Sequence, residues 1–142
     1  MVKIGNVMLA FDEGKWFDVP ATAGAFRLKI KPVLPGERYK YNREIRQMKE
    51  GDLEKIVRLV HSLASAKVVD WDSLQDAKGE PLVFSEVLLK DETFASVLLG
   101  LEVTEVEGDV SQRTPVANWL MKQILSPDAF VEEATESFLA NT

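Results

Sequence analysis

The sequence predicts an α+β fold, in which a small antiparallel meander at the N-terminus packs on a mainly α-helical bundle. Residues 26–31 alternate strictly between apolar and basic side chains, which is the period-two pattern of a half-buried strand. Residues 53–64 instead place apolar side chains at helical spacing behind a cap residue, Asp52. A chain of 142 residues has the length of one domain, so we expect a single domain over residues 1–142. This length is also enough to bury a core without disulfides or metal.

The predicted meander occupies residues 1–33. Short turn signals separate three apolar segments, which indicates three strands, at residues 2–11, 16–20 and 26–31. In the last of them, Phe26, Leu28 and Ile30 should face the core and the basic residues should face solvent. A small sheet of this kind is not stable alone, so it must pack on helices.

The remainder, residues 34–142, is predicted to be mainly helical, with one extended segment at 67–84. Helix starts are signalled by Pro35, by the cap residues Asp52, Ser85 and Asp91, and by the pairs Thr114-Pro115 and Ser126-Pro127. The acidic stretch 103–112 is expected to be a loop or a frayed helix end. These elements predict a core of Phe26, Leu28, Ile30, Leu53, Ile56, Val57, Val60, Trp71, Leu82, Phe84, Phe94, Leu98, Trp119, Leu120 and Phe138.

The extended segment has a turn in its middle. Asp76 and Gly79 stand at the first and fourth positions of this turn, where Asp and Gly are favoured. Pro81 lacks a backbone donor, so the stretch that contains it can only be an edge strand or a docked arm. Ser85 can then cap a helix.

Charge is distributed unevenly along the chain. Residues 1–50 carry ten basic and six acidic residues (+4), and residues 51–142 carry seven and seventeen (−10), which sums to −6. This asymmetry indicates either an ordinary solvated surface or an electrostatic interaction face. The acidic balance argues against nucleic acid as a partner.

Three features of the sequence favour a cytoplasmic protein. The N-terminus lacks a signal-peptide pattern, and no apolar run is long enough for a membrane span. The chain also contains no cysteine, which fits an intracellular protein.

Few residues suggest catalysis. His61 is the single histidine and is interpreted as a surface or boundary residue, because a lone His without Cys cannot form a usual zinc site. Asp70 and Asp72 flank Trp71 at strand spacing and could bind a cation, but the simpler interpretation is that both face solvent. Glycine-rich phosphate loops and nucleophile elbows are absent from the sequence. We therefore predict no enzymatic activity, no cofactor and no metal.

Two groups of residues are candidates for binding a partner. Trp119 is interpreted first as a core anchor and alternatively as an exposed interface residue, together with Phe130 and Phe138 of the apolar C-terminal helices. A basic strip runs through Lys29, Lys31 and Arg43. It is either a solvated face or a docking face for an acidic partner, such as the acidic C-terminal half of another copy.

Three stretches resemble proteins that assemble the tails of long-tailed bacteriophages and prophages, namely tail-assembly chaperones and adjacent tail components. Residues 16–32, from Trp16-Phe17-Asp18-Val19-Pro20 to Pro32, resemble the N-terminal hairpin of that family. Residues 69–85 resemble its central run, through Val69-Asp70-Trp71, Gly79-Glu80-Pro81-Leu82 and Phe84-Ser85. The helical remainder resembles its C-terminal half.

The resemblance implies a non-enzymatic role: binding the tape-measure protein and helping to recruit tail-tube subunits in the cytoplasm of the bacterial host. Such chaperones do not usually remain in the finished virion. The meander is a departure, because many tail chaperones are essentially all helical. A structural tail or connector component, or a prophage-encoded regulatory domain that binds a protein, are the alternatives.

Overall fold

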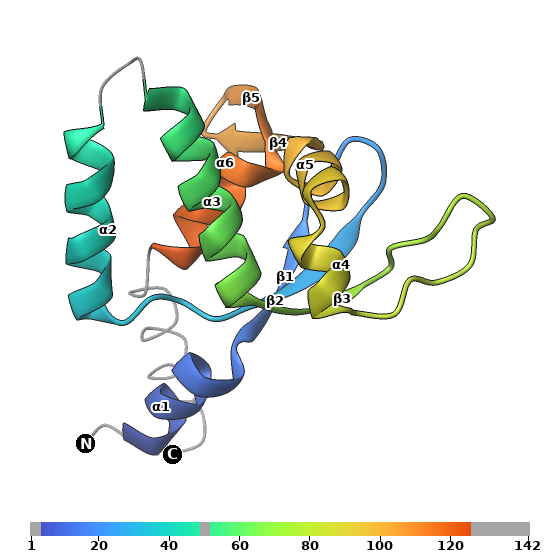
Figure 1. Cartoon of the computed structure of the whole chain (residues 1–142). Helices are drawn as coiled ribbons and strands as arrows, with labels where there is room; N and C mark the ends of the chain where they lie inside the picture. Colours follow the sequence, from blue (N-terminus) through green and yellow to red (C-terminus); the bar gives the residue numbers. More distant parts are fainter. Residues whose placement is uncertain (1–3, 49–51, 126–142) are drawn as a thin grey trace.

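A computed structural model of the chain describes residues 4–48 and 52–125 (Figure 1). The helices are α1 (Ile4–Glu13), α2 (Pro35–Gln47), α3 (Leu53–Lys67), α4 (Glu86–Lys90), α5 (Glu92–Gly100) and α6 (Val116–Ile124). The strands are β1 (Lys15–Val19), β2 (Phe26–Ile30), β3 (Val68–Asp72), β4 (Glu102–Glu107) and β5 (Val110–Pro115). Helices together with antiparallel strands confirm the α+β class.

The first sheet has three antiparallel strands in the order β1-β2-β3, with β2 in the centre. Leu28 is opposite Phe17 on one side and Trp71 on the other. As the alternation predicts, Phe26, Leu28 and Ile30 are buried and Arg27 is exposed, whereas Lys29 is half-buried. The third strand, however, comes from β3 and not from residues 2–11.

The predicted strand at residues 2–11 is wrong, because Ile4–Glu13 forms the helix α1. A short apolar run does not distinguish a helix from a buried strand by periodicity. Gly14 ends the helix with a φ of +80°, which favours glycine, and a Cβ built there would lie 2.8 Å from the Ile30 carbonyl oxygen. The glycine that looked like a turn between strands is therefore a helix terminator.

The predicted loop at 103–112 is also wrong, because it forms the hairpin β4–β5. Gly108, with a φ of +63°, supplies the tight turn, and Val103 is buried opposite Thr114. Two backbone hydrogen bonds join β4 to the segment after β1: Thr22 N–H donates to the Glu102 oxygen (2.9 Å) and Thr104 N–H to the Pro20 oxygen (3.1 Å). The hairpin is thus attached beside the first sheet.

The helix-start signals are confirmed at four of the positions that the structure describes. Pro35 begins α2. The Ser85 hydroxyl accepts from the Leu88 N–H (3.2 Å), and the Asp91 carboxylate accepts from the Phe94 N–H (2.9 Å). Asp52 holds the cap position of α3, where its carboxylate pairs with Lys55 (3.8 Å). At Thr114-Pro115 a helix begins as predicted but one residue later: Pro115 holds the cap position of α6, which starts at Val116, and both residues of the pair also end β5. The pair Ser126-Pro127 lies outside the described residues.

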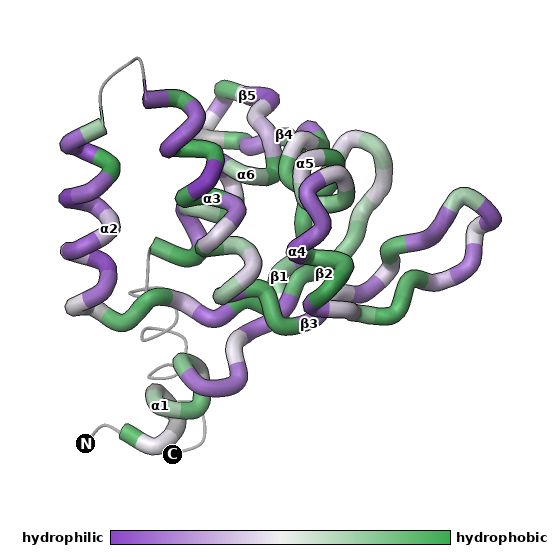
Figure 2. The backbone as a smooth tube through the Cα atoms, in the orientation of Figure 1, coloured by the Kyte–Doolittle hydropathy of each residue, from purple (hydrophilic) through white to green (hydrophobic). Residues whose placement is uncertain are grey.

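The core lies where β2 meets the C-terminal half of α3, the end of α5, and α6 (Figure 2). The predicted core residues Phe26, Leu28, Ile30, Trp71, Leu98, Trp119 and Leu120 are buried. Five others are only half-buried: Ile56, Val60, Leu82, Phe84 and Phe94.

Two predicted core residues are exposed. Leu53 is 67% exposed and Val57 is 45% exposed. The buried residues of α3 are Leu63 and Ala64, near its C-terminal end, so the apolar stripe of the first turns is only partly covered. Phe138, also predicted for the core, lies outside the described residues.

Candidate functional site

The predicted extended segment forms an arm, residues 73–84, that projects from the body after β3 (Figure 1). Its two halves are held together by backbone hydrogen bonds from Leu82 N–H to the Leu74 oxygen (2.8 Å) and from Asp76 N–H to the Glu80 oxygen (2.9 Å). Ser73, with a φ of 67°, makes the sharp exit from β3. The arm is therefore a defined hairpin-like element.

The tip of the arm is the turn that the sequence predicts. Gly79 N–H donates to the Asp76 backbone oxygen (3.0 Å), and the φ of Gly79 is +79°. The Asp76 carboxylate accepts from the N–H groups of Lys78 (2.8 Å) and Glu80 (3.0 Å). An Asp side chain that bonds to the following backbone in this way fixes the turn from within.

The base of the arm is anchored in the core by Trp71, which is 4% exposed. Its indole Nε1–H donates to the Leu82 backbone oxygen (2.9 Å). The rings of Phe84 and Phe94 pack on the indole, at centroid distances of 4.8 and 5.3 Å. The ring of Trp71 thereby joins β3, the returning half of the arm and α5.

The outer surface of the arm is open. Val83 is 84% exposed, and every residue from 75 to 81 is exposed. A hollow of about 740 Å³ lies between the arm and the loop that joins β1 to β2. Its described lining is Ala23, Gly24, Ala25, Phe26, Asp72, Ser73, Leu74, Gln75, Pro81 and Leu101. Small, apolar and amide side chains dominate this lining.

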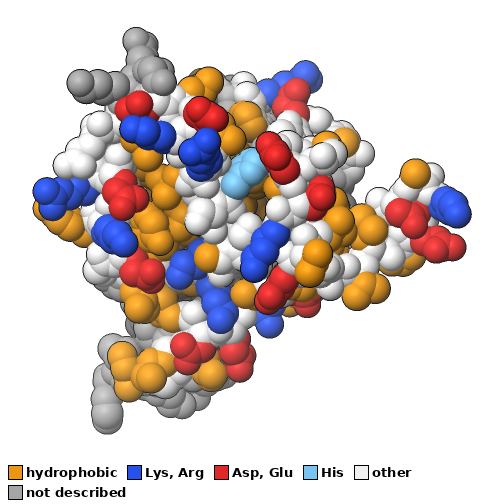
Figure 3. Space-filling view, viewed as in Figure 1, with side chains coloured by type: hydrophobic (Ala, Val, Ile, Leu, Met, Phe, Trp, Pro, Cys, Tyr) orange, Lys and Arg blue, Asp and Glu red, His pale blue; other side chains and the backbone are white. Residues whose placement is uncertain are grey.

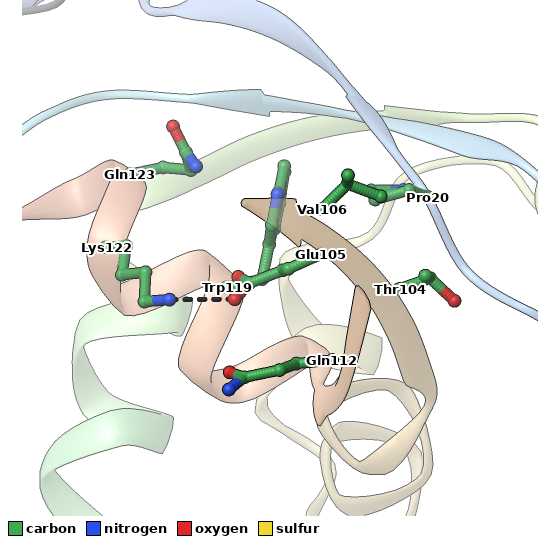
Figure 4. A pocket seen from close by; sticks show the side chains of 8 residues that line it. All are labelled: Pro20, Thr104, Glu105, Val106, Gln112, Trp119, Lys122 and Gln123. Atoms are coloured by element: carbon green, nitrogen blue, oxygen red, sulfur yellow. Dashed lines mark hydrogen bonds and ion pairs between the residues drawn. The ribbon is translucent and has the colours of Figure 1, made fainter. Parts of the chain in front are cut away.

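Trp119 lies at a second, smaller hollow of about 380 Å³ (Figure 4). The ring is 7% exposed and meets Phe17 edge-to-face at 6.2 Å, which confirms the interpretation as a core anchor. Beside it, Lys122 Nζ lies 2.8 Å from Glu105 Oε2. Little of the indole surface is therefore accessible to a partner, and the alternative interpretation of Trp119 as an exposed interface residue does not fit the structure. Phe130 and Phe138, proposed with it, lie outside the described residues.

The residues of the predicted basic strip belong to separate parts of the fold. Lys29 lies on β2 opposite Trp16 and Asp70, and Lys31 is half-buried in the connection to α2. Arg43 is exposed on α2. On the sheet, the neighbour Arg27 pairs with Asp18 (3.4 Å) and stacks over Trp16 (5.0 Å), so acidic and aromatic residues interrupt the strip there.

The titratable residues singled out from the sequence do not converge. His61 is half-buried on α3, whereas Asp70 and Asp72 lie on β3. The Asp70 carboxylate accepts from the Trp71 N–H (2.8 Å) and Asp72 is exposed. Within residues 4–48 and 52–125, no group of three or more His, Cys, Asp or Glu side chains is arranged to hold a metal ion.

Val83 and the hollow beside the arm were not singled out from the sequence. A signal for Val83 exists: Leu82 and Phe84 are half-buried and Val83 between them is exposed, as period-two alternation requires. The hollow has no such signal, because its walls come from residues 23–26, 72–75, 81 and 101, which are distant in the sequence.

None of the helices in the described part of the chain has the length and apolar character needed to cross a membrane. Compared with protein-family models, curated proteins and solved structures, the chain matches none of them.

Proposed function

We propose that the protein is a non-enzymatic tail-assembly protein of a bacteriophage or prophage, acting as a chaperone that binds the tape-measure or tail-tube protein. Two observations support the proposal. Residues 69–85 resemble the central run of that family, and the same residues form β3, the projecting arm and the cap of α4. The arm and its adjoining hollow are the proposed binding site.

The observation that carries the proposal is that, within the resembling run 69–85, the residues from Trp71 to Phe84 form and anchor one element, the arm. Trp71 anchors the arm through the Leu82 oxygen, and Phe84 packs on its ring. Gly79 makes the tip, and Ser85 begins the next helix. These residues hold the projecting arm in place, while the outward side chains of the arm stay exposed. This arrangement favours a role in binding a partner over a role in packing the core.

The chemistry of the arm suits a partner with apolar side chains. A tape-measure chain exposes apolar surface before the tube encloses it, and its binder needs an apolar centre with a polar rim. Val83 and the half-buried Leu74 provide apolar contacts, and Asp72 and Gln75 stand at the rim of the hollow. Binding there would cover apolar surface on both proteins.

The test is a pull-down of the tagged protein from cells that also express the tape-measure and tail-tube proteins of the same phage genome. We expect one of them to be recovered, and we expect Val83→Glu to reduce its recovery at least about tenfold by placing a charge in the apolar contact. Val106→Glu is the matched control, since Val106 is 72% exposed on the hairpin, away from the arm.

Recovery of neither tail protein, when both are soluble in the same extract, would refute the proposal. Equal losses with Val83→Glu and Val106→Glu would refute the arm as the site. A separate measurement distinguishes the alternative of a structural component: purified virions should lack a chaperone and contain a structural tail protein.

A further inference from the structure

The ladder between β2 and β3 stops at the pair Arg27–Asp72, although the chain continues beyond both residues. If the same register continued, residues 24–26 would stand opposite residues 73–75. The positive φ of Ser73 (67°) turns the chain away instead, and the two stretches line the hollow of about 740 Å³. Figure 1 shows the arm and the loop between β1 and β2 leaving the sheet separately. The hollow is therefore a gap between two diverging strands of one sheet.

Both walls of this gap carry backbone groups that can pair with another chain. Gln75 stands opposite Pro81 across the arm, and the two bonds that close the arm run on either side of this pair. In an antiparallel pair of this kind, the N–H and C=O of Gln75 point away from the returning half of the arm. Within residues 4–48 and 52–125, the backbone groups of Ala25 and Gln75 bond to no other backbone group. The walls of the hollow thus have the chemistry of a sheet edge.

We propose that the hollow takes an extended segment of the partner protein, which pairs with both walls and fills the gap as an added strand. This inference rests on the proposed function, since it specifies how the arm and the hollow hold a tail protein. The side chains of an added strand alternate between its two faces. The apolar lining residues Phe26, Leu74 and Leu101 are buried or half-buried, so they suit apolar side chains on one of these faces.

The charge of the arm complements a basic opposite face of the added strand. Asp72, at the rim of the hollow, is opposite Arg27 in the ladder, but Arg27 pairs with Asp18 (3.4 Å). Among the described residues, Asp72 forms no ion pair. Residues 72–80 contain three acidic residues and one basic residue, a net charge of −2, and Figure 3 shows acidic side chains on the arm. The occupant is therefore an extended segment in which apolar and basic residues alternate.

A synthetic peptide in which valine and lysine alternate tests this chemistry without any tail protein. Fluorescence anisotropy of the labelled peptide measures its binding to the purified full chain, and amide hydrogen exchange of the protein locates the contact. We expect exchange at Ala25 and Gln75 to slow at least about tenfold with the peptide in excess. A peptide that is methylated on its backbone nitrogens, or that has glutamate in place of lysine, should bind at least about tenfold more weakly.

Two tryptophan substitutions test the place of binding. Ala25 and Ala77 are both exposed, but Ala25 belongs to the described lining of the hollow and Ala77 does not. Ala25→Trp should fill the gap and lower the affinity for the peptide at least about tenfold, whereas Ala77→Trp should leave the affinity unchanged. Asp72→Lys should lower the affinity about fivefold, because it replaces an attraction at the rim with a repulsion.

The outcomes separate this inference from the proposed function. Unchanged exchange at Ala25 and Gln75, equal binding of the methylated or glutamate peptide, or equal losses with the two tryptophan variants would each overturn strand addition. These results would leave the proposed function standing if the pull-down still recovers a tail protein. Binding of the valine–lysine peptide as expected, with neither tail protein recovered, would refute the proposed function alone.

Discussion

Replacing Trp71 with Phe should loosen the arm and destabilise the fold. The change removes the Nε1–H that donates to the Leu82 oxygen at 2.9 Å, a bond within the normal range for a strong N–H···O contact. Loss of a partly buried bond of this kind costs about 1 kcal/mol. The smaller ring also leaves space against Phe84 and Phe94 and adds about 1–2 kcal/mol. We therefore expect the free energy of unfolding to fall by about 2–3 kcal/mol.

Urea denaturation followed by circular dichroism measures this loss, and the matched control is Trp16→Phe. Trp16 is half-buried on the first sheet under the Arg27 guanidinium, so its replacement should cost only about 0.5–1 kcal/mol. Limited trypsin digestion gives a second readout, because Lys78 is exposed at the arm tip. Cleavage there should rise at least about fivefold in Trp71→Phe relative to Trp16→Phe. Unchanged cleavage would refute the role of Trp71 as the arm's anchor, even if the fold were destabilised.

The remaining predictions concern backbone geometry and capping. Gly14→Ala should destabilise the fold by about 1–3 kcal/mol in urea denaturation, because Gly14 has a φ of +80° and an added Cβ would meet the Ile30 carbonyl. Gly5→Ala is its control in α1, with open space around the added Cβ, and should be neutral or stabilising by up to about 1 kcal/mol; equal losses would contradict the steric argument. Asp91→Ala should cost about 1 kcal/mol by removing the acceptor for the Phe94 N–H, and Asp91→Asn should recover most of it; a variant as stable as the parent protein would show that this cap contributes nothing.

The features predicted correctly from the sequence are those determined by a few adjacent residues. The alternation at 26–30, the caps at Ser85 and Asp91 and the turn at Asp76–Gly79 each depend on side chains that act on nearby backbone. Their physical causes operate within about four residues, so a local pattern is sufficient to identify them.

The features missed depend on partners far away in the chain. Residues 2–11 carry a short apolar run that periodicity alone cannot assign to a helix or a strand, and the third strand is supplied from 68–72 instead. Leu53 and Val57 have the spacing of core residues, but both are exposed at the end of α3 that lies away from the core. In the candidate site, the arm was predicted because it is local, whereas the hollow beside it was not, because distant segments form its walls.

The central position of β2 has a consequence for synthesis of the chain. Its partner β1 precedes it, but its other edge is filled only by β3, after α2 and α3 have been made. The segment after β1 can form its hydrogen bonds only after β4, which is synthesised later than β3. Contacts of such long sequence separation form slowly, so a nascent chain that ends before residue 68 holds Phe26, Leu28 and Ile30 without their cover. During translation, the unpaired edge of this central strand is therefore open to wrong pairing with other chains.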